Sequence, residues 1–525
     1  MTGWWEGAVG YQIYVRSFAD ADGDGVGDLP GARERLPYLA DLGVDVIWLT
    51  PFYPSPQADH GYDVSDYTGV DPVFGSVADV DHLVADAHRL GLRVLIDLVP
   101  NHTSDRHPWF ADARASRDSD RRDWYVWRDP APDGGPPNNW VSHFGGPAWT
   151  FDEVTGQYYL HLFLPEQPDL NWDHPEVRSA FRRILTFWFD RGVDGFRIDV
   201  AHALVKDPGL RDDPWIDGPP ADDASPQEVF AALDHVHDLD QPAVLDIYRE
   251  WRQVARRYDA VLVGEVYLLR PEALTRYVEG RDGLHAAFCF PVLKVDWDGP
   301  RIREILQRSV AAGGDRLAWP LSSHDDPRAA TRFGGGPTGS RRALAYLALL
   351  CALPGVPFIY QGDELGLEDG EVAAGADPIA VRNPGATGRD GARTPIPWAP
   401  GPGYGFTTGE PWLGFGANRH DGLTMLAQDA DPGSHLNAVR RLLACRRGLT
   451  GLHAAATVQW LDTTPGVVAF RRGDVLAACN AGDRSAVVTL PADGELVHAT
   501  GGDTRVEDRE LHLPADVTAY VRLPS

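Results

Sequence analysis

The chain has few cysteines, an excess of acidic over basic side chains, and no long apolar runs. Four cysteines in 525 residues stand far apart without a C-x-x-C pair. This excludes a zinc knuckle and a dense disulfide framework, and it predicts buried thiols in a reducing compartment. There are 76 acidic and 48 basic residues, a net charge of −28. Because such a chain repels phosphate backbones and anionic surfaces, we expect neither nucleic acid nor membrane as a partner.

No stretch approaches the ~18 apolar residues of a membrane span, and the first residues, MTGWWEGAVGYQIYVRSF, contain no basic segment typical of a signal peptide. We therefore expect a cytoplasmic, soluble protein. The hydrophobic share of 43% and the charged share of 24% exclude wholesale disorder. The length suits two or three domains, or one large barrel with attachments.

Short apolar runs alternate with amphipathic helical stretches, a pattern typical of parallel β/α units. Eight runs have strand character: 9–15, 44–49, 92–98, 195–200, 260–264, 286–290, 317–322 and 356–360. Helical patterns occupy 32–42, 77–90, 176–191, 247–257, 272–279, 302–310, 340–353 and 434–447. Eight of each predict an α/β fold, a (β/α)8 TIM barrel.

Two segments break this rhythm. The stretch after the third strand is rich in Pro, Trp, Asp and Gly, which indicates an inserted small domain. The C-terminal part alternates β-type runs with turns, at 458–461, 467–470, 475–479, 486–490, 496–499 and 518–523, which predicts an antiparallel β-sandwich. The expected division is a barrel of residues 1–101 and 176–448, an inserted domain at 102–175 and a C-terminal domain at 449–525. A long loop at 366–416 is expected to be functional or mobile.

Polar residues end four of the predicted strands, at the face where barrel active sites form. They are Asp97, Asn101 and His102, then Arg197 and Asp199, then Glu265, then His324 and Asp325. Three carboxylates, Asp199, Glu265 and Asp325, are expected to converge. Like charges brought together raise at least one pKa, so that an acid and an ionised nucleophile can coexist.

The segments DLVPNH, GFRID, GEVY and HDDPR resemble, in order, the four short sequence regions of glycoside hydrolase family 13, the α-amylase family. GYDVSDY, QPDLNW and GVPFIYQGDELGL support the resemblance, which spans nearly the whole chain. QPDLN and GRDGARTPIPW are similar to signatures of the α-glucosidase and oligo-1,6-glucosidase branch.

The resemblance implies a retaining two-carboxylate mechanism. Asp199 would be the nucleophile, Glu265 the general acid and base, and Asp325 the carboxylate that binds sugar hydroxyls and stabilises the transition state. The implied substrate-binding residues are Arg197, which orients Asp199; His102 and His324, which bind hydroxyls; Asp63 and Arg389, which close the pocket as a pair; and Tyr67, which stacks on the sugar ring.

Three positions need separate comment. Ser323 stands where the family commonly has Asn, which implies rearranged hydrogen bonding behind His324. Val200 follows the nucleophile, and in this branch a valine there is associated with α-1,6 bonds. His202 is not a general family residue, and we interpret it as a packed loop histidine.

The segment DADGDGVGD, residues 20–28, places oxygen ligands at alternate positions among glycines, which suits a hard cation. It is not an EF-hand, because its twelfth position is Gly31. An acidic surface turn is the alternative. The family resemblance implies one structural Ca²⁺ or Mg²⁺ site, with ligands Asp20, Asp22, Asp24, the Val26 carbonyl and Asp28, and no cofactor for catalysis.

The sequence thus predicts an exo-acting α-glucosidase that hydrolyses maltose and short malto-oligosaccharides, with transfer to acceptor hydroxyls as a side activity. An α-1,6-preferring oligo-1,6-glucosidase or a sucrose-acting enzyme is the alternative. A non-catalytic binding subunit of the same fold is disfavoured, because all three carboxylates are present. The expected partner is an α-gluco-oligosaccharide, and the expected state is a monomer or weak homodimer.

Overall fold

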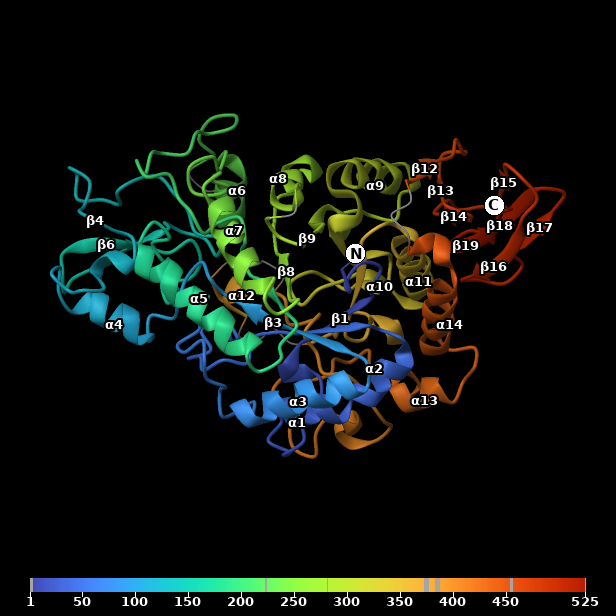
Figure 1. Ribbon diagram of the computed structural model, residues 1–525, viewed down its shortest axis with the longest axis horizontal. Coiled ribbons are helices and arrows are strands. Elements are labelled where there is room, and N and C mark those ends of the chain that lie inside the picture. The colour runs from blue at the N-terminus through green and yellow to red at the C-terminus, as the bar shows by residue number, and fades with distance from the viewer. Residues whose placement is uncertain are drawn as a thin grey trace.

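The computed structural model describes residues 3–221, 224–280, 282–372, 377–382, 388–453 and 457–524. Parts of the loop expected at 366–416 lie outside the described residues. Figure 1 shows an elongated molecule with the barrel in the middle, the segment with α4, β4 and β6 at one end and β12–β19 at the other.

Eight parallel strands close the barrel. They are β1 (Gly10–Ile13), β2 (Val46–Leu49), β3 (Arg93–Leu98), β7 (Gly195–Ile198), β8 (Val261–Gly264), β9 (Ala286–Phe288), β10 (Leu317–Pro320) and β11 (Val356–Tyr360). Neighbours follow this order, and β11 pairs with β1. All eight predicted strands are confirmed. They could be recognised because strands of a parallel sheet are buried on both faces and therefore form apolar, β-rich runs.

Helices follow these strands on the outside of the barrel (Figure 1). They are α1 (Leu29–Glu34), α2 (Leu36–Leu42), α3 (Val77–Arg89), α5 (Pro175–Phe189), α7 (Val244–Ala255), α8 (Thr275–Val278), α9 (Gly299–Gly313), α11 (Gly336–Ala352) and α14 (His435–Gly448). The predicted helix at 32–42 is divided at Arg35, after which Pro37 opens α2. Shorter helices are α6 (Pro226–Ala232), α10 (Ala329–Arg332), α12 (Pro378–Arg382) and α13 (Met425–Asp429).

The segment between β3 and α5 carries α4 (Pro108–Ala115) and an antiparallel sheet of order β4-β6-β5. Its strands are β4 (Trp127–Arg128), β5 (Trp149–Asp152) and β6 (Gln157–Leu160). Aromatic rings pack it together: Phe110 stacks on Trp127 at 5.6 Å, and Tyr159 meets both. Large rings supply the apolar area that so small a unit needs.

The C-terminal strands form two antiparallel sheets, of order β12-β13-β14-β19-β16 and β15-β18-β17. They are β12 (Gln459–Trp460), β13 (Val467–Arg472), β14 (Val475–Asn480), β15 (Ala486–Thr489), β16 (Glu495–Ala499), β17 (Arg505–Glu507), β18 (Glu510–Leu513) and β19 (Val517–Arg522). The six predicted strands are present. The short β17 and β18 were missed, because β17 is mainly charged and β18 has only two apolar residues.

All four cysteines are free, and three are buried, whereas Cys445 is partly exposed. Within the described parts of the chain, none of the helices has both the length and the apolar character that crossing a bilayer requires.

Candidate active site

Three carboxylates surround one buried arginine where β3, β7 and β8 end. Arg197 is 2% exposed, and its Nη1 contacts Asp97 Oδ1 at 3.0 Å and Asp199 Oδ1 at 2.6 Å. Its Nη2 lies 2.8 Å from Glu265 Oε2. Arg197 and Asp199 share a face because they are two residues apart on a strand, and the parallel register sets Asp97 beside Arg197. The fold therefore gathers Asp199 and Glu265 at one guanidinium.

Burial and mutual repulsion of the carboxylates favour a shared proton in this cluster. Burial raises the pKa of Asp97 to about 7, against the opposing effect of Arg197. Burial also raises the pKa of Asp199, and the Glu265 and Asp97 carboxylates add to that effect while Arg197 opposes it. Since one guanidinium cannot balance three close carboxylates, the proton belongs to the group as a whole. A carboxylic acid and an ionised carboxylate can therefore coexist here.

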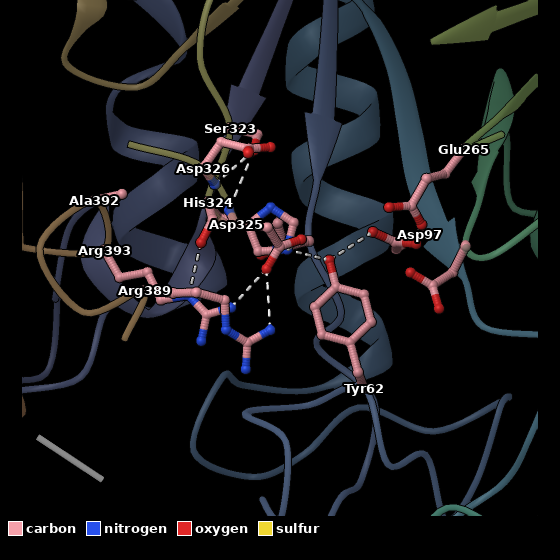
Figure 2. Close-up of polar contacts among 12 residues, drawn as sticks. Tyr62, Asp97, Glu265, Ser323, His324, Asp325, Asp326, Arg389, Ala392 and Arg393 are labelled. Carbon is pink, nitrogen blue, oxygen red and sulfur yellow. Dashed lines mark hydrogen bonds and ion pairs between the residues drawn. The ribbon is translucent and has the colours of Figure 1, made fainter. Parts of the chain in front are cut away.

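The third predicted carboxylate, Asp325, faces a set of cations (Figure 2). Its Oδ1 accepts hydrogen bonds from Arg389 Nη1 at 3.1 Å and Arg393 Nη2 at 2.8 Å. Burial alone would raise the pKa of Asp325, but the Arg389 and Arg393 guanidinium groups hold it well below its usual range. The side chain is 36% exposed, so an ionised carboxylate is open to a ligand.

His324 is a neutral imidazole with a defined tautomer. The Gln12 amide donates to His324 Nδ1 at 2.7 Å, which leaves the ring proton on Nε2. Nε2 lies 2.7 Å from the Tyr62 hydroxyl and 3.2 Å from Asp325 Oδ2. Burial lowers the pKa of His324 to about 3. Gln12 was not among the predicted site residues, although a polar residue within the apolar run of β1 was a usable signal.

Arg389 pairs with a different carboxylate from the predicted one. Its Nη2 lies 2.8 Å from Asp59 Oδ1, and its Nε donates to Asp377 Oδ1 at 3.0 Å. Asp63 instead accepts hydrogen bonds from Ser55 Oγ at 2.8 Å and the Asp59 backbone N–H at 3.0 Å. Asp63 is fully buried and holds the turn that carries Asp59. The predicted pair of Asp63 with Arg389 is therefore wrong.

Tyr67 does not lie where the sequence predicted it, against the sugar ring. It is 2% exposed, and its hydroxyl donates to the carbonyls of Val99 and His102 at 2.9 and 2.7 Å. The tyrosine at the site is Tyr62, whose ring is stacked on His324 with centroids 5.4 Å apart and planes at 9°. Tyr62 therefore lies at the site beside His324, whereas Tyr67 is enclosed behind the loop.

His102 lies beside the pair formed by Asp59 and Arg389. Gln167 Nε2 is 3.1 Å from His102 Nε2 and 3.3 Å from Asp59 Oδ2, which links the two residues. Burial lowers the pKa of His102 to about 4, so the ring is neutral. Phe163 packs on it with centroids 5.1 Å apart. His102 therefore joins the polar edge that carries Asp59.

Ser323 fixes the turn that presents Asp325. Its Oγ accepts hydrogen bonds from the backbone N–H groups of Asp325 at 3.2 Å and Asp326 at 3.1 Å. The Ser323 hydroxyl thus caps the turn locally, at the position where the family commonly has the larger side chain of Asn.

Val200 has a φ of 44°, in the left-handed region that β-branched residues avoid. Its N–H donates to Glu265 Oε2 at 2.9 Å. Such strain persists where the surroundings enforce it, and here it orients the Glu265 carboxylate. His202 is 2% exposed and packs in the adjoining loop, with its Nδ1 accepting from the Tyr267 N–H at 3.4 Å.

The acidic segment at 20–28 folds back on itself beside α1. The carboxylates of Asp20, Asp22 and Asp28 each place an oxygen within 4.8 Å of the others. Asp28 also caps α1 by accepting from the Gly31 N–H at 2.6 Å. Asp24 accepts from the Val26 N–H at 2.8 Å and stands outside the three-residue group. A set of hard oxygen donors at this spacing fits Ca²⁺ or Mg²⁺.

Comparisons with known proteins agree with this architecture. The family described as Alpha amylase, catalytic domain, matches residues 12–453. A probable alpha-glucosidase of Rhizobium meliloti (strain 1021) is 41% identical, over 99% of this chain and 97% of its own. An oligo-1,6-glucosidase of Halalkalibacterium halodurans is 36% identical, over 95% and 94%. The crystal structure of the alpha-glucosyl transfer enzyme XgtA superposes with a TM-score of 0.93 at 42% identity, covering 99% of this chain and 100% of that one. The chain therefore belongs to the α-amylase family, glycoside hydrolase family 13.

Proposed function

We propose that this protein is a retaining, exo-acting α-glucosidase that releases terminal non-reducing glucose from maltose and short malto-oligosaccharides. The observation that carries the proposal is Arg389, which contacts both Asp59 and Asp325 and so spans the pocket next to the catalytic carboxylates. The similar proteins named alpha-glucosidase and oligo-1,6-glucosidase support the same substrate class.

In the first half-reaction, an Asp199 oxygen attacks the anomeric carbon and the glycosidic bond breaks. Glu265 gives its proton to the leaving oxygen. In the second, Glu265 takes a proton from water, the water oxygen bonds to the anomeric carbon, and the Asp199 ester bond breaks. Two inversions retain the configuration. Arg197 favours the ionised form of Asp199 against the effect of burial and orients its carboxylate, because Arg197 Nη1 lies 2.6 Å from Asp199 Oδ1.

The ring hydroxyls of the bound glucose would be held by the second polar group. Asp325 is ionised and open, and His324 presents an N–H beside it. Asp59 and Arg389 would bind the hydroxyl farthest from the cleaved bond, which leaves no room for another sugar unit. Tyr62 would support the ring face. A sugar hydroxyl can replace water in the second half-reaction, so transfer to acceptors is the expected side activity.

The second candidate is an α-1,6 preference. Val200 and the similarity to an oligo-1,6-glucosidase favour it. We expect maltose to be hydrolysed with a higher kcat/KM than isomaltose, trehalose or sucrose when one preparation is tested on all four. A higher kcat/KM for isomaltose would establish the α-1,6 alternative, and one for sucrose would indicate a sucrose-acting enzyme.

The acidic loop at 20–28 would hold one structural Ca²⁺ or Mg²⁺ through Asp20, Asp22, Asp24, the Val26 carbonyl and Asp28. A Ca²⁺-selective chelator is therefore expected to lower the melting temperature, because an ion bound only to the folded state stabilises it. Catalysis at low temperature should be unchanged. Added Ca²⁺ should restore the melting temperature of the wild type but not that of Asp22→Asn. An unchanged melting curve, together with no bound ion by elemental analysis, would contradict the site.

A further inference from the structure

A second cluster of metal-ligating side chains lies in the connection between β7 and α7. Asp213, His235 and Asp238 each present a ligand atom, and these atoms lie within 4.8 Å of one another. Both aspartates are 1% exposed. Asp213 lies at one end of the segment 213–238, and His235 and Asp238 lie at the other, so the cluster joins the two ends. An isolated β-bridge between Trp215 and Leu233 also joins them. The proposed glycosidase mechanism uses none of these residues.

Two carboxylate oxygens in this cluster are buried and, among the residues that the structure describes, have no hydrogen-bond partner: Asp213 Oδ2 and Asp238 Oδ1. The other oxygens are engaged, since Asp213 Oδ1 accepts from the His237 N–H at 2.8 Å and Asp238 Oδ2 lies 2.8 Å from His235 Nδ1. Paired buried carboxylates with vacant lone pairs are unfavourable unless a cation or proton lies between them.

His235 is oriented as a metal ligand would be. Its Nε2 is 3.0 Å from the Phe230 carbonyl oxygen, which can only accept, so Nε2 carries a proton. Its Nδ1 lies 2.8 Å from Asp238 Oδ2, so a proton joins these two atoms when no ion is bound, and a metal ion would displace that proton. Metal-bound histidines commonly donate their second N–H to a backbone carbonyl in this way. The Phe230 ring, 4.0 Å away between centroids, holds the imidazole in place.

We propose that Asp213, His235 and Asp238 bind one divalent transition-metal ion, for which Zn²⁺ is the best match. One imidazole nitrogen and two carboxylates are a donor set that Zn²⁺ accepts, with water as a fourth ligand. Ca²⁺ would require about six to eight oxygens, which this group does not offer. The site thus differs in chemistry from the all-oxygen loop at 20–28.

The ion would anchor one wall of the substrate pocket. Phe230, which orients His235, packs on His143 with centroids 4.4 Å apart. His143 is stacked on Phe163 at 4.7 Å, and Phe163 packs on His102 at 5.1 Å. A metal ion that binds both ends of the segment 213–238 therefore also holds in place the row of rings from Phe230 to His102, which reaches the sugar site. Its role is structural and acts through this row.

The test is titration of chelator-stripped protein with Zn²⁺, followed by calorimetry and by the melting temperature. The wild type, the acidic-loop variant Asp22→Asn and the matched control His237→Gln are expected to bind one equivalent and to melt at a higher temperature with Zn²⁺. Asp213→Asn and His235→Gln should bind it at least about 100-fold more weakly. Co²⁺ should give visible bands in the wild type that His235→Gln lacks.

Absence of a Zn²⁺ equivalent in the wild type would overturn the proposal, as would full binding by both ligand variants. A proton shared within the cluster would then account for the vacant oxygens. If Asp213→Asn does not fold, His235→Gln and the wild-type stoichiometry still decide. These readouts do not depend on glucosidase activity, so this proposal and the proposed function can fail separately.

Discussion

Asp199→Asn and Glu265→Gln are each expected to lower kcat/KM on maltose by at least about 10³-fold, because each substitution removes one half of a two-carboxylate mechanism. The melting temperature should change little, since both variants keep the shape and the hydrogen-bonding capacity at Arg197. Initial rates with maltose and thermal unfolding of the same preparations measure the two effects.

Glu250→Gln is the matched control for the loss of one carboxylate. Glu250 forms ion pairs with Arg178 and Arg182 on the outside of the barrel, so activity should be unchanged. Azide should rescue Asp199→Ala and Glu265→Ala with glucosyl azides of opposite anomeric configuration, because azide replaces the nucleophile in one and attacks the intermediate in the other. More than a tenth of wild-type activity in either charge-neutral variant would contradict the assignment.

The second large effect concerns Arg389 and Asp59. Either Arg389→Ala or Asp59→Asn is expected to lower kcat/KM by about 100-fold, roughly 3 kcal/mol, because each removes one charge of the buried pair that should bind the terminal glucose. Wild-type enzyme should release glucose from maltotetraose from the first turnover. Timed product analysis of both variants and the wild type measures this.

Arg382→Ala is the control for this experiment. Arg382 lies on α12, and its contact with Glu166 is 3.5 Å with both side chains partly exposed, so little should change. Arg389→Lys keeps the charge but not the paired geometry and should remain strongly impaired. Early maltose or maltotriose from the interior of starch chains in the wild type would mean that the pocket is open and the exo assignment wrong.

The sequence by itself determined the barrel and the three carboxylates at its strand ends to which we assign catalysis. Strand runs such as β3 and β11 are buried on both faces, so composition alone identifies them. Asp199, Glu265 and Asp325 could be found because each ends such a run, and the ends of parallel strands meet at one face. Arg197 could be paired with Asp199 in the same way, since two-residue spacing on a strand fixes a shared face. The regular period of a strand thus allows its position, and the side chains at its end, to be identified from the sequence.

Only the tertiary structure decided which residues close the pocket. Asp59 and Asp63 stand four residues apart in an irregular loop, where no period says which side chain faces inward. Left-handed backbone at Gln57, His60 and Gly61 reverses the chain there and turns Asp59 and Tyr62 toward the pocket. The partner of Asp59, Arg389, lies 330 residues away. Such contacts depend on loop geometry and on close approach in space, which local sequence patterns do not encode.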